Sequence, residues 1–488
     1  MNRADLRVAV GLAANVLGVG ALFLPWTARV EFGWAALFGW IYLVVCGALL
    51  VRALALAALV PGGVAGLAGV AFGARFARAV HAFYAVGVTL GQAVVAVVAA
   101  GFVAQSFGYA ETAWWVAVLV IAIGTVVAGT GRQISRPRPV VRLVVVLVLL
   151  AAGVMLSRTG HDVPPPPPAG PELFLAAAFL QLFAVVGWES TPQLLGETGT
   201  SRARGPLAGV LVVAVVHGLA LLGAGAAANQ PVAPGLLLPG LGPGGGRVVS
   251  LLFAVAVGYF CVRNIGTAAG AAARAWTGAA PTMWSLRLAA PAVGLVSAAG
   301  ALLITRGRVS AIDVLSVPNA MALSVFAVAA AAVLVSGRRR AWPVSAVSAH
   351  LPLALFAGPA FVLPVALAAG FAVRPAFALE RWATYSFAEL AAERDRSRQR
   401  YLEFLRRHAL SAGIYVLAAG TDDPQQPHRE DELYFVIEGR ARFGANGESR
   451  HVGPGCLIYV PAGLPHRFTD IEADLSVLVV FAPAETSL

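Results

Sequence analysis

The chain has 488 residues, of which 59% are hydrophobic and only 12% are charged. This composition excludes an ordinary soluble protein and indicates a chain that crosses a membrane several times. All of its basic residues are arginines, which excludes lysine Schiff-base chemistry. The three cysteines, Cys46, Cys261 and Cys456, are too widely spaced to suggest a disulfide framework or a zinc cluster.

The net charge of +11 is unevenly distributed along the chain. The first 375 residues carry 23 arginines against 8 acidic residues, whereas the remainder carries 12 against 16. Because the positive charge lies in loops between apolar segments, it reports membrane topology, and no nucleic-acid partner is expected.

Apolar segments of about 20 residues, the length that crosses a bilayer, recur along the first 373 residues. They predict a multi-pass α-helical membrane domain of about twelve spans, or eleven if the last two form one tilted span. The first segment lacks a small-residue cleavage site, so a retained helix is expected rather than a signal peptide. The segments are 8–28, 33–58, 78–105, 112–130, 139–156, 172–197, 206–228, 248–272, 286–305, 310–336, 342–357 and 358–373.

The arginines of the predicted loops indicate the orientation. Fourteen of them, Arg142 included, fall on the same side as the N-terminus, and five fall on the opposite side. The positive-inside rule therefore places the N-terminus in the cytoplasm. An even number of spans places the C-terminal part there too, in a protein of the inner (plasma) membrane.

The first apolar segment contains the stretch Gly18-Val-Gly-Ala-Leu-Phe-Leu-Pro25. Glycine and proline cost a helix interior about 1 and 3 kcal/mol relative to alanine, so a broken helix is predicted here. Amides freed at such a break can bind a carboxylate, as in transporters with discontinuous helices. Alternatively, Gly18 and Gly20 only allow a neighbouring helix to pack closely.

Two charges are predicted inside apolar segments. Glu189 is the one acidic residue of the first 375 that falls well inside such a segment. An intramembrane carboxylate is costly and suits a proton carrier, with a hydrogen-bonded brace between helices as the alternative. Arg263, in the eighth segment, either stands where sodium-driven transporters hold a coupling cation or extends to the cytoplasmic face.

Several motifs resemble those of permeases of the amino acid–polyamine–organocation superfamily, most closely exporters of methionine and branched-chain amino acids. Besides the broken first segment, they are Val60-Pro-Gly-Gly63, Ala71-Phe-Gly73, Phe183-Ala-Val-Val-Gly-Trp-Glu-Ser190 and Gly258-Tyr-Phe260. The resemblance covers about residues 1–373. It implies two inverted five-helix repeats whose first and sixth helices are broken near the middle of the membrane.

The resemblance also implies a substrate site between the two broken helices. A pocket of small and aromatic residues without a fixed counter-charge favours apolar side chains over charged ones. The implied residues are Gly18, Val19, Gly20 and Ala21 for the substrate carboxylate, Ala184 and Gly187 for its amino group and side chain, Phe183 as an aromatic gate, and Glu189 for coupling.

The composition changes abruptly after residue 375, which predicts a separate domain over residues 376–488. A polar, helix-like stretch at 387–398 is followed from Tyr401 by short alternating strands with glycine turns. Two motifs resemble those of cupins, small all-β barrels of two sheets. The motif residues are Gly420, Gln426, His428, Glu432 and Gly439, then Gly455, Pro461, Gly463 and His466.

The cupin resemblance implies a site for a divalent transition metal, Fe, Mn, Ni or Zn, held by His428, Glu432 and His466. Gln426 stands where the family usually has a first histidine, and it is a weaker ligand. Such a site would have three protein ligands plus water, or would load poorly. Sensing of a metal or a small ligand is the expected role of this domain, and catalysis is the alternative.

Together these features predict a secondary transporter of small neutral amino acids fused to a cytoplasmic cupin. Only the resemblance to exporters implies the direction, which would make the chain a proton-coupled efflux antiporter. The expected partners are the amino acid, protons and the lipid bilayer, and a homodimer is compatible with the sequence. The alternatives are a proton-coupled importer, a membrane-anchored cupin metalloenzyme, and a receptor that binds amino acids without moving them.

Overall fold

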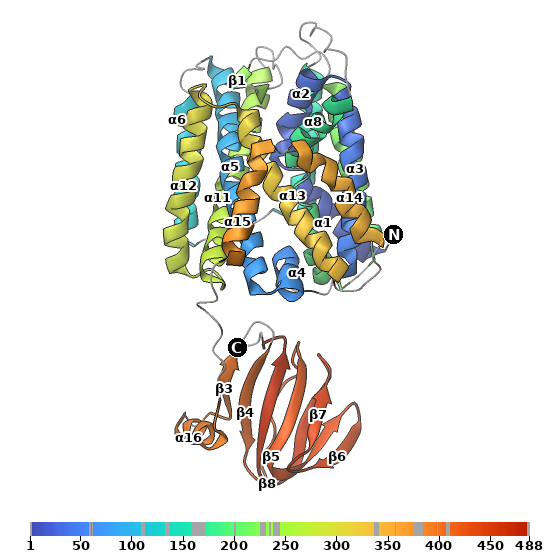
Figure 1. Ribbon diagram of the computed structural model, residues 1–488, viewed down its shortest axis with the longest axis vertical. Helices are drawn as coiled ribbons and strands as arrows, with labels where there is room; N and C mark the ends of the chain where they lie inside the picture. Colours follow the sequence, from blue (N-terminus) through green and yellow to red (C-terminus); the bar gives the residue numbers. More distant parts are fainter. Residues whose placement is uncertain are drawn as a thin grey trace. The chain divides into compact units, whose positions relative to one another are not determined.

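Figure 1 shows the computed structural model. The structure describes residues 2–57, 60, 62–108, 113–131, 137–157, 171–199, 202–224, 231–233, 236–237, 245–335, 341–356, 358–373, 384–397, 399–406 and 410–485. The chain forms two compact units, Met1–Arg374 and Pro375–Leu488. The residues around the predicted domain boundary, and Pro61 of the second permease motif, lie outside the described residues.

The first unit is built of helices. Their bounds are α1 (Arg3–Val16), α2 (Val19–Phe32), α3 (Ala35–Leu54), α4 (Gly63–Phe72), α5 (Ala74–Phe107), α6 (Ala113–Gly129), α7 (Pro139–Ser157), α8 (Pro171–Gln181), α9 (Thr191–Thr198), α10 (Arg204–Gly223), α11 (Gly245–Thr277), α12 (Met283–Thr305), α13 (Ala311–Val335), α14 (Ala341–Phe356) and α15 (Val362–Val373). A short hairpin, β1 (Pro231–Ala233) and β2 (Leu236–Leu237), precedes α11.

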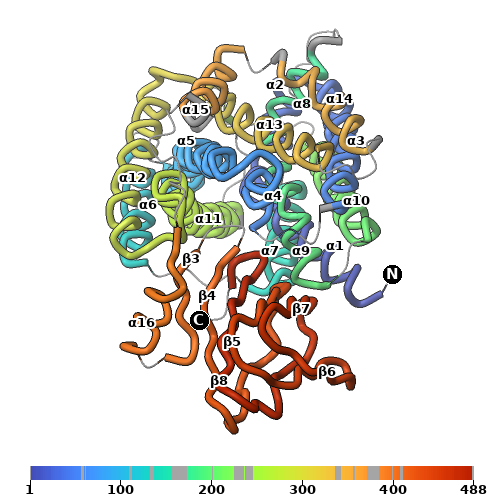
Figure 2. Tube along the Cα trace, turned by 60° about the horizontal axis from the view of Figure 1, so that its bottom comes forward, coloured from blue at the N-terminus to red at the C-terminus, as the bar shows by residue number. Residues whose placement is uncertain are grey.

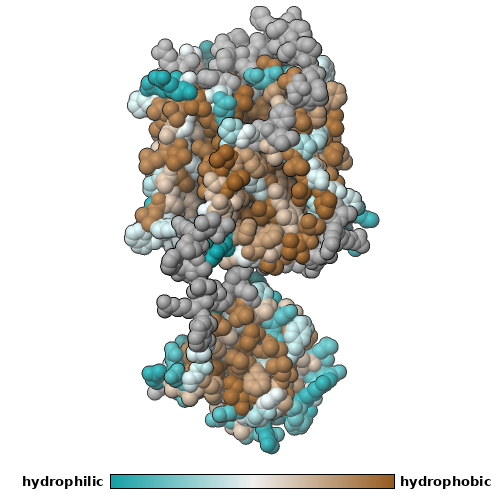
Figure 3. Space-filling view, in the orientation of Figure 1, coloured by the Kyte–Doolittle hydropathy of each residue, from teal (hydrophilic) through white to brown (hydrophobic). Residues whose placement is uncertain are grey.

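Among the described residues, six helices are long and apolar enough to cross a membrane, and the number rises to eight if each of two bent pairs counts as one span. The count of about twelve spans therefore stays a prediction. The central helix α5 packs against α6, α11, α12 and α13 (Figure 2). Large apolar side chains of the outer helices face away from the unit and form the apolar surface visible in Figure 3, as a lipid-facing surface requires.

Two helices are broken. The helices α1 and α2 meet at an angle of 60° across Leu17 and Gly18, where the sequence predicted a break. The second bent pair, Leu173–Val185 and Trp188–Thr198, turns by 45°. Two 3₁₀ turns, Leu182–Val185 and Trp188–Ser190, replace the α-helix between α8 and α9.

The second unit is an antiparallel β-structure with one helix, α16 (Phe387–Ser397), as the sequence predicted. Its strands are β3 (Tyr401–Arg406), β4 (Ser411–Leu417), β5 (Asp431–Ala445), β6 (Glu448–Val452), β7 (Leu457–Val460) and β8 (His466–Ala482). The sheet order is β3-β4-β8-β5-β6, and β7 pairs with β5. Buried aromatic and aliphatic side chains from β4, β5, β7 and β8 form its own core.

The strand β5 alternates between the two faces of the sheet at its start. Glu432, Tyr434 and Val436 are buried on the inner face, at 2%, 1% and 0% exposure. Leu433 and Phe435 lie on the outer face and remain 37% and 40% exposed. This alternation, which follows from the two-residue period of a strand, places one carboxylate and one phenol hydroxyl inside the barrel.

Candidate functional site

The two breaks of the helical unit lie against each other. A Cβ atom at Gly20, in the first turn of α2, would lie 2.8 Å from the Cα atom of Ala184. Gly187 has a φ of +135°, and a Cβ atom there would lie 3.1 Å from the carbonyl oxygen of Asn15. Glycine is required at both positions because backbone faces backbone. The structure thus places Gly20 against Ala184, and Gly187 against the end of α1. The sequence assigned these three glycine and alanine residues to the substrate site.

The other residues of the predicted substrate site lie in the same two segments. Gly18 is the residue before α2, and Val19 and Ala21 are buried in its first turn, whose amides have no partner within the helix. Phe183 is half-buried in the first 3₁₀ turn and packs beside Gly91 of α5.

Glu189 lies at the second break and not in a continuous helix. Its Oε2 atom accepts a hydrogen bond of 2.7 Å from the backbone amide of Gly187, and the hydroxyl of Ser190 donates to the Gly187 carbonyl at 2.6 Å. Both backbone groups of Gly187 are therefore held by side chains. The carboxylate is therefore part of the local structure of the break.

The sequence missed a polar bridge between these breaks. The guanidinium of Arg142 donates to the Asn15 side-chain oxygen at 3.3 and 3.4 Å, and the Asn15 amide donates to the Ser190 hydroxyl at 3.1 Å. Arg142 is only 8% exposed and belongs to α7. Its assignment to a loop was therefore wrong, because the positive-inside rule counts charges near the ends of segments and takes no account of the direction of a side chain.

Asn319 of α13 was also missed. Its side-chain amide donates to the carbonyl oxygens of Phe179 and Leu180 at 2.7 and 3.5 Å. These carbonyls are at the end of α8, where the helix can no longer supply amide partners. A lone asparagine beside Pro318 in an apolar segment was the available signal.

Arg263 lies half-buried within α11, and its guanidinium donates to the side-chain oxygen of Asn264 at 3.1 Å. This position is compatible with either of the two roles predicted for it.

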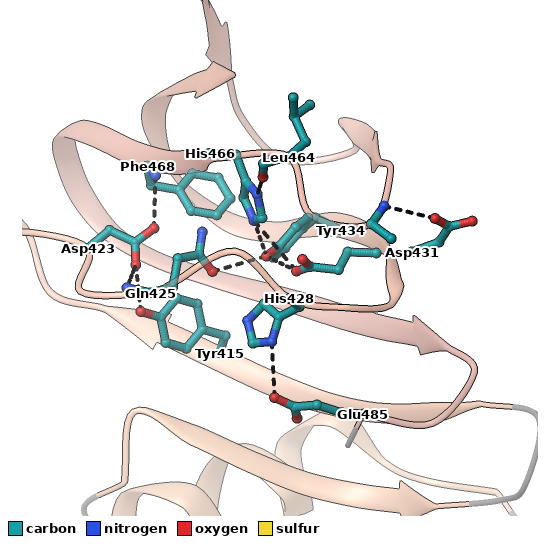
Figure 4. A network of polar contacts seen from close by, with 12 residues as sticks. Tyr415, Asp423, Gln425, His428, Asp431, Tyr434, Leu464, His466, Phe468 and Glu485 are labelled. Atoms are coloured by element: carbon teal, nitrogen blue, oxygen red, sulfur yellow. Dashed lines mark hydrogen bonds and ion pairs between the residues drawn. The ribbon is translucent and has the colours of Figure 1, made fainter. Parts of the chain in front are cut away.

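The second site lies inside the β-structure and is centred on the hydroxyl of Tyr434 (Figure 4). This hydroxyl lies 3.0 Å from Gln425 Oε1, 3.0 Å from His466 Nε2, and in short contact with Glu432 Oε2. Strand β5 contributes Glu432 and Tyr434, His466 begins β8, and Gln425 belongs to the loop before β5. Four polar side chains therefore converge from three parts of the chain.

The charges of this centre depend on burial and on hydrogen bonding. His466 Nδ1 donates to the carbonyl of Leu464 at 2.7 Å, which leaves Nε2 directed at the centre. Burial lowers the pKa of His466, but the Glu432 carboxylate and the Leu464 carbonyl outweigh burial, and the pKa lies above its usual value. Burial and the nearby Glu432 carboxylate raise the pKa of Tyr434 well above the usual range.

The metal ligands predicted from the motifs are not assembled as one set. Glu432 and His466 lie together, with Oε2 and Nε2 separated by 3.6 Å. His428 instead pairs with Glu485 at 3.2 Å, and Gln426 is exposed to solvent. Among the described residues, no group of three or more His, Cys, Asp or Glu side chains lies close enough to hold a metal. In this arrangement His428 and Gln426 lie apart from Glu432 and His466, and the loop before β5 directs Gln425 inward.

A cavity of about 630 Å³ leads to this centre from the solvent. Its walls include Gln425, Gln426, Asn446, Ser449, His466 and Thr469. Polar and apolar groups line the cavity about equally, so it offers hydrogen-bonding partners to a small ligand.

Residues 413–481 match the family model of the cupin domain. The chain has a C-terminal cupin domain. The cupin resemblance of the sequence is therefore confirmed. No family model matches the helical unit.

Individual relatives extend this comparison. Over 98 residues the chain is 50% identical to the uncharacterised protein SCO3923 of Streptomyces coelicolor, which corresponds to 20% of this chain and 93% of that protein. Over that stretch the two proteins belong to one family. Over 74 residues it is 31% identical to the dimethylsulfoniopropionate lyase DddQ of Ruegeria pomeroyi, covering 15% of this chain and 37% of DddQ.

Among solved structures, the chain is similar to an RmlC-like cupin family protein of Methanocaldococcus jannaschii with a double-stranded β-helix fold. The two are 20% identical, and the match covers 17% of this chain and 78% of that one, with a TM-score of 0.16.

Proposed function

We propose that this chain is a secondary transporter of small neutral amino acids, of the methionine or branched-chain type, in the inner membrane. Transport would be proton-coupled efflux by alternating access, with both termini in the cytoplasm. The observation that carries the proposal is the direct contact of the two helix breaks at Gly20, Ala184 and Gly187.

The chemistry of this contact region supports an amino acid substrate. The first amides of α2 point out of the helix start, where the helix dipole favours a carboxylate. The carbonyl groups freed at the second break suit an ammonium group, and the side chains around both breaks are mainly apolar. Glu189 would change the geometry of the second break when it binds a proton, because its carboxylate holds the Gly187 amide.

The cupin domain would sense a metal ion or a small polar ligand in the cytoplasm. Its cavity reaches His466, so a bound ligand would contact the polar centre directly. Transport and sensing are separate activities in this proposal, and each can be tested without the other.

The test of transport is the flux of labelled methionine and leucine in proteoliposomes, with and without a pH gradient. Gradient-dependent flux of either amino acid is expected from the wild-type chain. Glu189→Gln should abolish the dependence on the gradient, whereas Glu197→Gln, an exposed acid on α9, should not. Binding without flux would refute transport and favour a receptor, and unchanged pH dependence in Glu189→Gln would leave Glu189 as a brace.

A lyase activity of the cupin is a second candidate, favoured by the match to DddQ and by the cavity that opens onto His466. Consumption of dimethylsulfoniopropionate by the purified full chain, followed by proton NMR, tests it. No consumption after addition of Fe²⁺, Mn²⁺, Ni²⁺ or Zn²⁺ would exclude this substrate.

A further inference from the structure

Four arginines gather at one corner of the helical unit, where the start of α5, the end of α11 and the start of α12 meet. These three helices pack against one another (Figure 2), and residues 278–282 join α11 to α12. The four are Arg75 and Arg78 in the first two turns of α5, Arg274 in the last turn of α11, and Arg287 in the second turn of α12. The three helices contain no acidic residue of their own.

Arg78 fixes the geometry of this corner. Its guanidinium donates to the carbonyl oxygens of Ala275 and Trp276 at 2.9 and 2.8 Å. These carbonyls end α11, where the helix carries only a partial negative charge. The turn after α11 lies close as well, since a Cβ atom at Gly278 would be 3.5 Å from Arg78 Cδ. The start of α5 and the end of α11 are therefore held together before any ligand binds.

The arginine corner is bordered by exposed aromatic and apolar side chains. Trp276 and Trp284 are 61% and 72% exposed, and tryptophan favours the level of the lipid headgroups. Along α12, Trp284, Leu288 and Leu295 share one helical face and are all exposed. Arg287 is exposed beside the start of this face. Positive charge thus lies at the end of an apolar strip, as a phospholipid requires.

We propose that this corner binds an anionic phospholipid, with its headgroup on the arginines and its acyl chains along the exposed face of α12. A zwitterionic headgroup carries a cation of its own, which four arginines disfavour, so the site selects net negative charge. The predicted topology places the corner at the cytoplasmic leaflet, where anionic lipids attract basic residues. The inference rests on the proposed membrane location but not on transport.

The test is lipid retention by the purified full-length chain in detergent. The chain is incubated with equal amounts of dioleoylphosphatidylglycerol and dioleoylphosphatidylcholine, passed through gel filtration, and assayed for retained lipid by mass spectrometry. Phosphatidylglycerol should be retained in excess and should raise the midpoint of thermal unfolding, because a ligand of the folded state stabilises it. Inorganic phosphate at the same concentration should not displace the lipid, and displacement would assign the corner to a free anion instead.

Two exposed arginines allow the site to be weakened without disturbing the fold. Arg75→Gln and Arg287→Gln should each weaken phosphatidylglycerol binding about fivefold, and the double variant about 25-fold. Arg204→Gln is the matched control, because Arg204 is exposed at the start of α10 and is predicted on the same side of the membrane. It should retain lipid as the wild type does.

Two results would overturn the proposal. The first is equal retention of both lipids by the wild type. The second is an equal loss in Arg204→Gln, because the effect would then come from the overall charge of that membrane side and not from this corner. Absence of amino acid flux would leave lipid binding standing, and absence of lipid selectivity would leave transport standing, so the two proposals fail separately.

Discussion

Substitution of Gly20 by alanine tests whether the two helix breaks must touch. The added Cβ atom would lie 2.8 Å from Ala184 Cα, 3.1 Å from Ala184 N and 3.2 Å from Phe183 O, all backbone atoms. Overpacking of this kind costs about 1–3 kcal/mol, while alanine regains up to about 1 kcal/mol of helix propensity. Because backbone atoms cannot rotate away, we expect the steric cost to dominate.

Gly18→Ala is the matched control in the same break. The nearest atom to a Cβ there is the Val16 carbonyl oxygen at 3.9 Å, an ordinary contact. Both variants would be compared with the wild type by thermal unfolding in detergent. A cost of 1–3 kcal/mol in the state with touching breaks corresponds to about a 5- to 150-fold change in its population. Equal stability of the two variants would refute the packing argument.

Three further substitutions probe other parts of the structure. Arg142→Ala should lower the stability of the helical unit by about 1.5–3 kcal/mol, which is the usual contribution of hydrogen bonds to a charged group. Arg138 is exposed, so Arg138→Ala should change the stability by less than about 0.5 kcal/mol. Similar unfolding midpoints of the two variants in detergent would contradict the polar bridge. Gly439→Ala places a Cβ atom 2.4 Å from a backbone oxygen at a φ of +89°, whereas the Cβ atom of Gly444→Ala meets nothing closer than 3.7 Å. The cupin should therefore unfold at a lower temperature in Gly439→Ala than in Gly444→Ala. Equal unfolding midpoints, followed by fluorescence, would contradict this prediction. Burial and a hydrogen bond to Asp423 raise the pKa of Tyr415 above its ordinary value of 10.0. The neutral phenol therefore stabilises the folded state fully below pH 10, and this stabilisation is lost as the pH rises further. Tyr415→Phe should weaken the loss of stability at alkaline pH, and an unchanged pH profile of unfolding would refute the assignment.

The helices could be predicted because apolar length is a strong signal. Each described helix from α5 to α7 begins and ends within about four residues of a predicted segment. The first break was predictable too, since glycines and a proline oppose a continuous helix. The polar bridge could not be predicted, because Asn15 and Ser190 are 175 residues apart in the sequence. A single polar residue also forms no periodic pattern that would indicate its partner.

In the cupin, spacing identified Glu432 and His466 because both lie on strands, where the period of two fixes the face. Spacing failed for Gln425 and Gln426, which precede β5 in a loop. There, each residue's direction depends on its local backbone angles, and neighbours of the same type cannot be distinguished. Tyr434 could have been found from its position two residues beyond Glu432.

The placement of Glu432 and Tyr434 on alternate positions of β5 limits which length changes the cupin can accept. One residue inserted into the start of this strand would turn both polar groups outward and bring Leu433 and Phe435 into the barrel centre. Such an insertion would leave an apolar interior that can still fold, but it would remove both polar groups from the centre of the barrel. Length variation should therefore accumulate in the loops, and an even shift of register is the one change within the strand that retains polar groups inside.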